Sequence, residues 1–275
     1  MLQIIYLQFK KVKSNVASNH ALIEFLPAQN SICTTSKNHI IPILNSLEKK
    51  KRHHLTAFSN TNTTSLVSMA ESINSNKTLH QIAVAFKNLA NTVSDSQSAE
   101  VEVAPFSHAC SLISPLFGSL GIAFKFAEKD YVAKVNDLAE ASKSVPKLHS
   151  LIDQDVQANS VRNAGSHTRN LLRVKRGLDM VRVLFQQMII TEGNSLRDPA
   201  SKAYEQALAP YHGWAIKKAV SAGMYLIPTK EQLLNKLNED AESAKVQMQI
   251  YVSASEAVIQ YIDKLFDSRN LGTDW

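Results

Sequence analysis

The sequence has little glycine, little proline and almost no cysteine, and each shortage excludes a class of protein. Its 275 residues include 8 Gly and 8 Pro, about 3% of each against a usual ~7% and ~5%, which argues against turn-rich β-sandwiches and barrels. The two cysteines, Cys33 and Cys110, exclude a disulfide framework and a cysteine-rich zinc site. No apolar run approaches the ~18 residues of a membrane span. A hydrophobic content of 44% nevertheless provides the side chains for a sizeable core.

The positive charge is confined to one part of the chain. Residues 1–68 contain 8 Lys and Arg against 2 Asp and Glu, whereas residues 69–275 contain 22 of each. The longer part is therefore neutral overall, and the net charge of +6 gives no support to a diffuse nucleic-acid-binding surface. We expect no nucleic-acid partner, and any basic site in residues 69–275 must be local.

Residues 1–68 have the composition of a disordered leader or extension. Ser, Thr and Asn make up 21 of these 68 residues, and no helical or strand period is sustained. Three interpretations remain open: a true start at Met69 with translated sequence upstream of it, a disordered extension, or a targeting segment. We expect one folded domain at 69–275 and no chemistry in residues 1–68.

The spacing of apolar residues from Met69 onward predicts an all-α domain. Within 78–93, for example, Ile82, Phe86 and Leu89 recur at helical intervals. We expect eight or nine helices joined by short connections, and we find no convincing hairpin signal. The expected segments are about 78–93, 106–117, 122–142, 147–160, 166–190 and 239–266, with shorter helices after Pro199, Pro210 and Pro228.

Two charged residues fall on the apolar side of the helix expected at 122–142. At roughly 100° per residue, Asp130 and Lys134 lie within the arc that Tyr131 and Leu138 occupy. Charges on the core side of a helix are costly unless they pair or bind a polar group. The pattern fits a binding site for a polar ligand, and it fits equally well an ordinary ion pair between residues i and i+4.

Three arginines form a basic ridge on the long helix expected at 166–190. Arg169, Arg173 and Arg176 fall within about 60° of one another on a helical wheel, and Arg173 borders the apolar stripe. Arg169 and Arg173 are one turn apart, so their guanidinium groups can close on one anion, such as a phosphate with its several oxygens. The alternative is a solvated basic face without a ligand.

The segment from Pro210 to Lys218 combines a histidine, a tryptophan and two lysines near a helix start. His212 can donate or accept a hydrogen bond as a neutral imidazole. Trp214, followed by Lys217 and Lys218, has the composition of a membrane-interface contact, an amphipathic ring beside cations that attract anionic lipid. Taken alone, a single histidine is more often structural, and a single tryptophan is more often part of a core.

The sequence signatures of catalysis and of metal binding are absent. The chain has no glycine-rich phosphate loop, no G-x-S-x-G motif, no H-E-x-x-H motif and no Cys/His metal spacing. His108 and Cys110 are two residues apart, so on a helix they point to different sides. We therefore expect no catalytic residues, no metal and no cofactor, and a protein that is not an enzyme.

Four segments carry a resemblance to a known family: FSHACSLISPLFGSLGIAFKFAEKDYVAKV (106–135), AGSHTRNLLRVKRGLDMV (164–181), YHGWAIKKAV (211–220) and the ending LGTDW. With them, residues 69–275 resemble the glycolipid transfer protein superfamily, and within it the branch that transfers ceramide-1-phosphate. The resemblance implies a two-layer all-α sandwich of about eight helices, which encloses an apolar lipid pocket with a polar headgroup site at its mouth. It also implies non-vesicular transfer of sphingolipids by a cytosolic protein that contacts membrane surfaces transiently.

The resemblance assigns a role to each polar residue singled out above. Asp130 would accept a hydrogen bond from the sphingoid amide N–H, and His212 would contact the acyl amide carbonyl. The basic residues Lys134, Arg169 and Arg173 would bind the headgroup.

The resemblance also assigns residues to the membrane and to the lipid chains. The residues expected to dock the protein on a membrane are Trp214, Lys217 and Lys218. The apolar residues expected to line the pocket are Phe106, Leu112, Phe117, Leu172, Val183 and Phe185. Burying each CH₂ of a lipid chain there would favour binding by about 0.8 kcal/mol.

Two positions distinguish a phosphate headgroup from a sugar. Family members that are specific for glycolipids have Asp-x-x-x-Asn where this chain has Asp130-x-x-x-Lys134, and they have Trp where this chain has Arg173. Tryptophan offers a stacking face to a sugar ring, whereas lysine and arginine offer charge to a phosphate monoester of about −1.5 to −2. The resemblance therefore favours ceramide-1-phosphate, or a related phosphosphingolipid, over a glycolipid.

Three alternative functions compete with lipid transfer. A lipid sensor or adaptor that regulates protein partners, in cell-death or defence control, needs the same pocket, so the sequence does not separate it from a carrier. A nucleic-acid binder that uses 169–176 is disfavoured by the neutral charge of residues 69–275. A lipid hydrolase lacks a nucleophile–base pair. The sequence leaves the protein partners unassigned.

Overall fold

The structure, a computed structural model, describes residues 77–94 and 100–275. The expectation for residues 1–68 lies outside the described residues. Within the described ranges the chain forms ten α-helices, labelled α4 to α13, and two short 3-10 helices. The first five are α4 (Thr78–Ser94), α5 (Val103–Ser111), α6 (Ser114–Ser119), α7 (Lys125–Ala141) and α8 (Leu148–Gln157). The others are α9 (His167–Ile190), α10 (Arg197–Ala207), α11 (Trp214–Gly223), α12 (Lys230–Lys236) and α13 (Ala241–Asp267), with η1 (Ile122–Phe124) and η2 (Ala209–Tyr211).

The all-α prediction is confirmed, and two of the predicted segments are divided. The segment expected at 106–117 is two helices, α5 and α6. Pro115 has no N–H to donate to the Ser111 carbonyl, so the helix ends there and α6 begins with the proline in its first turn. The segment expected at 122–142 begins as η1, directly after Gly121, whose φ of 106° is accessible to glycine.

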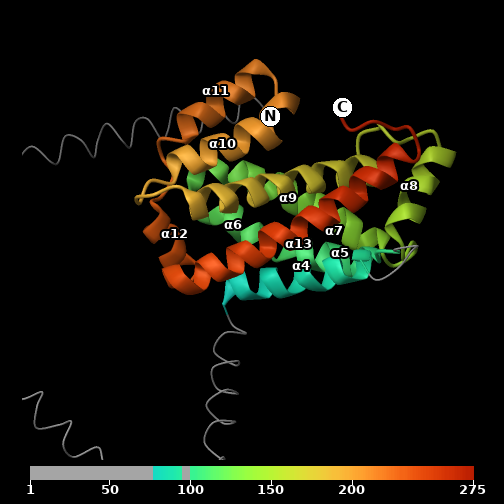
Figure 1. The fold of residues 1–275 in the computed structure, drawn as a ribbon. Helices are drawn as coiled ribbons and strands as arrows, with labels where there is room; N and C mark the ends of the chain where they lie inside the picture. Colours follow the sequence, from blue (N-terminus) through green and yellow to red (C-terminus); the bar gives the residue numbers. More distant parts are fainter. Residues whose placement is uncertain (1–76, 95–99) are drawn as a thin grey trace, which may run out of the picture. The chain divides into compact units, whose positions relative to one another are not determined.

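Helix α9 lies at the centre of the arrangement. It packs against α10 on one side and against α13 and α7 on others, and α13 in turn packs along α4 (Figure 1). Ser166 caps its start, because the Ser166 hydroxyl accepts a hydrogen bond from the Arg169 N–H at 3.1 Å. A central helix must bury apolar residues on several sides, and α9 does so along its whole length.

The core is packed through aromatic contacts and one close helix approach. The Tyr251 ring on α13 meets Phe86 of α4 edge-on at 4.9 Å and Phe185 of α9 at 5.4 Å. A Cβ added at Gly177 would lie 2.7 Å from the Tyr131 ring, so glycine allows α9 to approach α7 closely at this point. This contact sets the spacing between the two helices that carry most of the predicted polar site.

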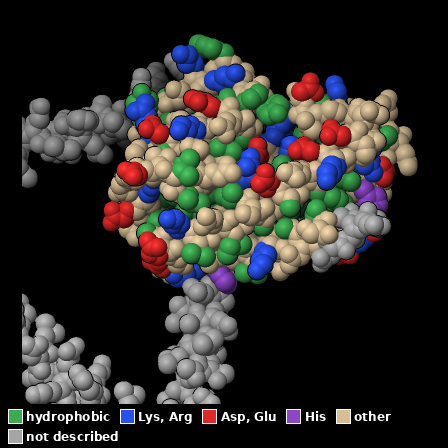
Figure 2. Space-filling view, viewed as in Figure 1, with side chains coloured by type: hydrophobic (Ala, Val, Ile, Leu, Met, Phe, Trp, Pro, Cys, Tyr) green, Lys and Arg blue, Asp and Glu red, His purple; other side chains and the backbone are tan. Residues whose placement is uncertain are grey.

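The surface of the face in Figure 2 carries acidic and basic side chains that alternate with hydrophobic ones. This mixture agrees with the equal numbers of acidic and basic residues in 69–275. None of the helices in 77–94 and 100–275 is long and apolar enough to cross a membrane.

Candidate functional site

The five predicted polar residues lie on three neighbouring parts of the chain. Asp130 and Lys134 are on α7, Arg169 and Arg173 are on α9, and His212 lies between η2 and α11. The helices α7 and α9 pack against each other, which brings the first four side chains to one junction. The charges of Arg173 and Asp130 act on the pKa of His212, so His212 belongs to the same cluster.

The two residues on α7 form an ion pair with one buried and one exposed partner. Lys134 Nζ lies 2.6 Å from Asp130 Oδ1 and donates to the Asp130 carbonyl oxygen at 3.2 Å. The Lys134 side chain is only 11% exposed, whereas the Asp130 side chain is 60% exposed. The i, i+4 pair predicted as one alternative is therefore present. The exposed Asp130 carboxylate can still accept hydrogen bonds from a further donor.

The two arginines on the first turns of α9 lack an acidic partner among the described residues. In the part of the chain that the structure describes, neither Arg169 nor Arg173 forms an ion pair with a carboxylate. Partial burial and the neighbouring Arg169 lower the pKa of Arg173, and Asp130 opposes this shift. Two neighbouring guanidinium groups that no carboxylate pairs offer several N–H donors, which match the oxygens of an anion such as phosphate; the anion-binding role stays a prediction.

Arg176 does not belong to the solvated ridge that the helical wheel predicts. It is buried, and its guanidinium lies 3.3 Å from the centre of the Tyr211 ring. Arg176 Nη2 donates to the carbonyl oxygens of Thr273 and Trp275, both at 2.7 Å. Burial lowers its pKa, and its Nε has no hydrogen-bond partner among the described residues. Arg176 thus ties α9 to η2 and to the segment after α13.

His212 is held by a tyrosine and lies in a positive environment. Its Nδ1 is 3.1 Å from the Tyr204 hydroxyl of α10, and the two rings lie 5.6 Å apart. Burial lowers the pKa of His212, as do the charges of Arg173 and Arg176, while Asp130 opposes them. The imidazole is therefore neutral near pH 7 and offers one N–H donor and one acceptor nitrogen.

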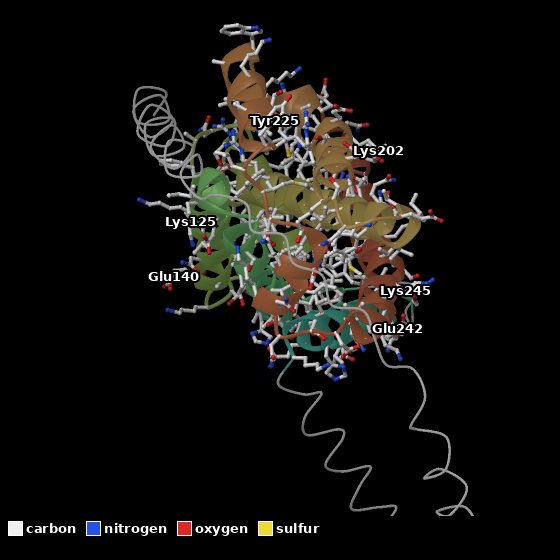
Figure 3. The ribbon with its side chains drawn as sticks, turned by 90° about the vertical axis from the view of Figure 1, so that its left-hand side faces the viewer. Lys125, Glu140, Lys202, Tyr225, Glu242 and Lys245 are labelled. Carbon is white, nitrogen blue, oxygen red and sulfur yellow. The ribbon has the colours of Figure 1, made fainter. Side chains whose placement is uncertain are left out.

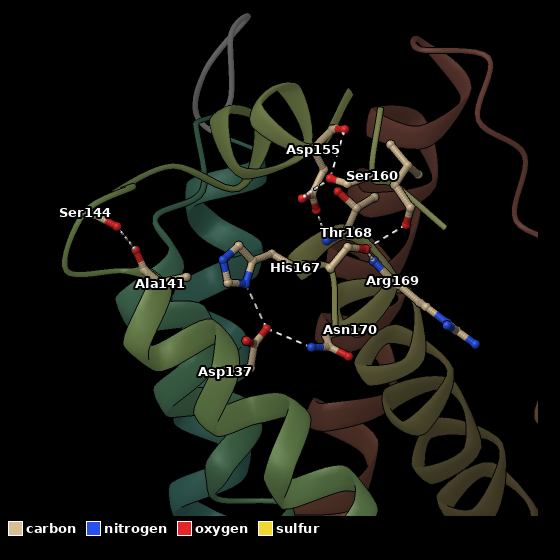
Figure 4. A network of polar contacts seen from close by, with 11 residues as sticks. Asp137, Ala141, Ser144, Asp155, Ser160, His167, Thr168, Arg169 and Asn170 are labelled. Carbon is tan, nitrogen blue, oxygen red and sulfur yellow. Dashed lines mark hydrogen bonds and ion pairs between the residues drawn. The ribbon is translucent and has the colours of Figure 1, made fainter. Parts of the chain in front are cut away.

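A polar network fixes the start of α9 against its neighbours (Figure 4). Asp137 of α7 accepts hydrogen bonds from His167 Nδ1 at 2.9 Å and from Asn170 Nδ2 at 2.8 Å. Asp155 of α8 accepts from the Thr168 backbone N–H at 2.7 Å, which satisfies one of the free donors of the first helical turn. These contacts hold the turn that carries Arg169 in place.

The predicted docking residues are exposed on one helix. Trp214 is the first residue of α11 and is 75% exposed. Lys217 and Lys218, on the next turn, are also exposed. A large exposed indole is unusual for a residue that is ordinarily buried, and such a residue marks a candidate contact surface. The placement fits the predicted role, which stays a prediction.

Sequence analysis missed four further exposed apolar residues near this helix. Ile122 of η1 is 61% exposed and Tyr225, after α11, is 68% exposed; Phe126 and Ile216 are exposed to a lesser degree. Helix α11 contacts η1, so these residues lie on α11 itself or on the elements next to it. Figure 3 shows Tyr225 near the upper end of the domain. Periodicity could not find them, because it does not distinguish an exposed apolar residue from a core one.

The six predicted pocket residues lie in the core. Five are buried, and Leu112 is partly buried against the same cluster. A cavity of about 400 Å³ lies elsewhere, between the end of α9, α12 and the start of α13, and none of the six lines it. Glu242 and Lys245, which line that cavity, lie at the lower right of the folded domain in Figure 3. The lipid-lining role of the six residues stays a prediction.

This fold and sequence are similar to those of known proteins. A sequence model of a family described as "Glycolipid transfer protein (GLTP)" matches residues 101–239. Accelerated cell death 11 of Arabidopsis thaliana is 61% identical over 208 residues, which are 75% of this chain and 100% of that protein. The ACD11 homolog protein of the same plant is 46% identical over 205 residues, 73% of this chain and 90% of that one. The fold also matches a crystal structure of an Arabidopsis accelerated cell death 11 mutant complexed with C12 ceramide-1-phosphate. The TM-score is 0.71 and the sequence identity is 62%, over 72% of this chain and 98% of that one.

Proposed function

Because the chain belongs to the glycolipid transfer protein family, we propose that it transfers a sphingolipid with a phosphate headgroup, ceramide-1-phosphate, between membranes. The observation that carries the proposal is a pair of guanidinium groups, Arg169 and Arg173, that no carboxylate of residues 77–94 or 100–275 pairs, beside the Asp130–Lys134 ion pair. The ceramide-1-phosphate complex of the 62% identical Arabidopsis protein supports the same lipid for this chain.

The headgroup is bound by charge. Lys134, Arg169 and Arg173 supply three positive charges, and with the one negative charge of Asp130 the cluster carries a net +2, which balances a phosphate monoester of about −1.5 to −2 at neutral pH. Arginine binds phosphate oxygens through two parallel hydrogen bonds, and these charge-assisted bonds are roughly twice as strong as neutral ones. A neutral sugar offers no counter-charge to this cluster, so the site selects the phosphate.

The ceramide amide is bound by the two remaining polar residues. The exposed Asp130 carboxylate accepts a hydrogen bond from the amide N–H. His212 is neutral because its pKa is lowered, and it donates its single N–H to the amide carbonyl. Together the two residues recognise the amide that ceramide-based lipids share, while the cations select the headgroup.

Transfer also requires contact with the membrane and binding of the lipid chains. The surface around Trp214 rests on the membrane with its apolar side chains in the headgroup region, while the protein stays peripheral. The lipid chains then lie among the apolar side chains of the core, where each buried CH₂ stabilises the complex by about 0.8 kcal/mol. No covalent bond of the lipid changes, so the proposed activity is that of a carrier rather than an enzyme.

The experiment is an intervesicle transfer assay with the full chain and two lipids of equal chain length. We expect ceramide-1-phosphate to move at least about tenfold faster than a monoglycosylceramide, because a charge-assisted bond contributes ~1.5–3 kcal/mol. Equal rates for both lipids would overturn the headgroup assignment. Tight binding of ceramide-1-phosphate without transfer would instead support the lipid-sensing adaptor.

A further inference from the structure

We infer that Tyr204 is a positioning residue that sets the tautomer of His212, so that the imidazole proton is on Nε2. The inference rests on the proposed function in one respect: Nε2–H is the donor that meets the lipid amide carbonyl. Tyr204 itself lies on α10 and is assigned no contact with the lipid.

The contact between the two residues is specific. The Tyr204 hydroxyl lies 3.1 Å from His212 Nδ1, and the rings are tilted by 38° with their centres 5.6 Å apart. Tyr204 is buried, so its orientation is fixed by packing on α10. Within residues 77–94 and 100–275, His212 Nδ1 is the single hydrogen-bond partner of this hydroxyl.

Two arrangements of the proton satisfy this hydrogen bond. In the first the Tyr204 hydroxyl donates to Nδ1, and Nε2 carries the imidazole proton. In the second Nδ1–H donates to the tyrosine oxygen, and Nε2 is left as an acceptor.

The first arrangement is the more stable one. A phenol, with an ordinary pKa near 10, is a far stronger acid than a neutral imidazole N–H, and the imidazole nitrogen is a stronger base than a phenol oxygen. Burial raises the pKa of Tyr204, so the hydroxyl keeps its proton. Burial and the charges of Arg173, Arg176 and Lys217 lower the pKa of His212 against the effect of Asp130, so the ring stays neutral.

The consequence is a donor that is set before the lipid arrives. With its proton on Nε2, the ring presents an N–H to a carbonyl without first exchanging a proton with water. A hydrogen bond to one ring nitrogen is the usual way in which proteins fix the function of the other.

The first test reads the tautomer directly in the lipid-free protein. Nitrogen-15 NMR of the His212 imidazole should show an unprotonated Nδ1 and a protonated Nε2 in the wild type. The variant Tyr204→Phe should shift the ring toward a mixture of tautomers, whereas the control Tyr261→Phe, which removes a hydroxyl that bonds to the Val101 N–H instead, should not. A protonated Nδ1 in the wild type, which needs no variant, would overturn the inference. An unchanged tautomer in a folded Tyr204→Phe would also overturn it.

The second test separates positioning from a merely structural role. Two soluble probes are compared: a short-chain ceramide-1-phosphate, and sphingosine-1-phosphate, which has the phosphate and lacks the acyl carbonyl. Tyr204→Phe should lower the affinity for the first about five- to tenfold and leave the second unchanged, because one neutral hydrogen bond is at stake. An equal loss for both probes would contradict the inference. Failure of the wild type to bind ceramide-1-phosphate would instead refute the proposed function, and the tautomer measurement would still decide the inference.

Discussion

Helix α9 carries two sets of cations that differ in what neutralises them. Lys175 pairs with Asp263 of α13, and Arg182 pairs with a carboxylate one turn earlier. Arg169 and Arg173 have no carboxylate partner in the described residues. Both sets are basic residues on one helix, so a positive charge alone does not mark a binding site. A cation held partly out of water without a partner is costly, and a charged ligand compensates for that cost.

Reversing the charge of Arg173 should produce the largest effect. Arg173→Glu removes a charge-assisted contact, worth about 1.5–3 kcal/mol, and adds repulsion toward the phosphate, so ceramide-1-phosphate transfer should fall by about 100-fold or more. The measurement is intervesicle transfer, with circular dichroism to confirm folding.

The matched control for this variant lies on the same helix. Arg182→Gln removes a paired arginine and should change the transfer rate less than about twofold, since its charge is already neutralised within the fold. If both variants lose transfer equally, the distinction between paired and unpaired cations is wrong.

A second comparison concerns two exposed apolar residues, one on the expected docking helix α11 and one on α13. Trp214→Ala should weaken binding to anionic vesicles about tenfold, since an inserted ring contributes about 1.5 kcal/mol. Val246 of α13, also exposed, is the control, and Val246→Ala should leave vesicle binding unchanged. Vesicle co-sedimentation compares the two. Unchanged binding by Trp214→Ala would remove α11 from the docking surface.

The paired cations should affect stability rather than function. Lys175→Gln breaks the ion pair with Asp263 and should lower the free energy of unfolding by about 0.5–1 kcal/mol, as expected for a partly exposed pair. Urea denaturation of Lys175→Gln, Asp263→Asn and the double variant isolates the interaction energy of the pair. A transfer defect larger than the stability loss would place Lys175 in the site instead.

The smallest effect concerns pH. The pKa of His212 in the folded state is below its ordinary value near 6.5. The unfolded chain therefore binds more protons than the folded one as pH falls through about 6.5, and stability decreases with it. His212→Gln should flatten the stability profile between about pH 7 and 5. An identical profile in variant and wild type would mean that the pKa is not lowered.

Much of the fold could be predicted because helix formation is local. The apolar spacing at 78–93 and at 166–190 lies in the sequence itself, and α4 and α9 form where it indicates. The break between α5 and α6 could also have been read from Pro115. The close approach of α7 and α9 could not, because it depends on Gly177 facing Tyr131 across two helices.

The polar cluster was predictable only in part, for a similar reason. A helical wheel places Asp130 and Lys134 on one face of one helix, and their ion pair follows from that. The wheel does not distinguish Arg173 from Arg176, since the difference is made by distant residues. Tyr211 and the segment after α13 bury Arg176, and no comparable ring or carbonyl contact holds Arg173 within residues 77–94 and 100–275. Tyr204 was missed because only tertiary packing brings it to His212.

The most direct test of the central claim is the coupling between the lipid phosphate and Arg173. Four affinities are needed: wild type and Arg173→Gln, each with a short-chain ceramide-1-phosphate and with the matching ceramide. The account predicts that the phosphate raises the wild-type affinity by about 100-fold or more and that Arg173→Gln removes most of this preference. An equal preference for the phosphate in both proteins would show that the unpaired arginine does not bind it.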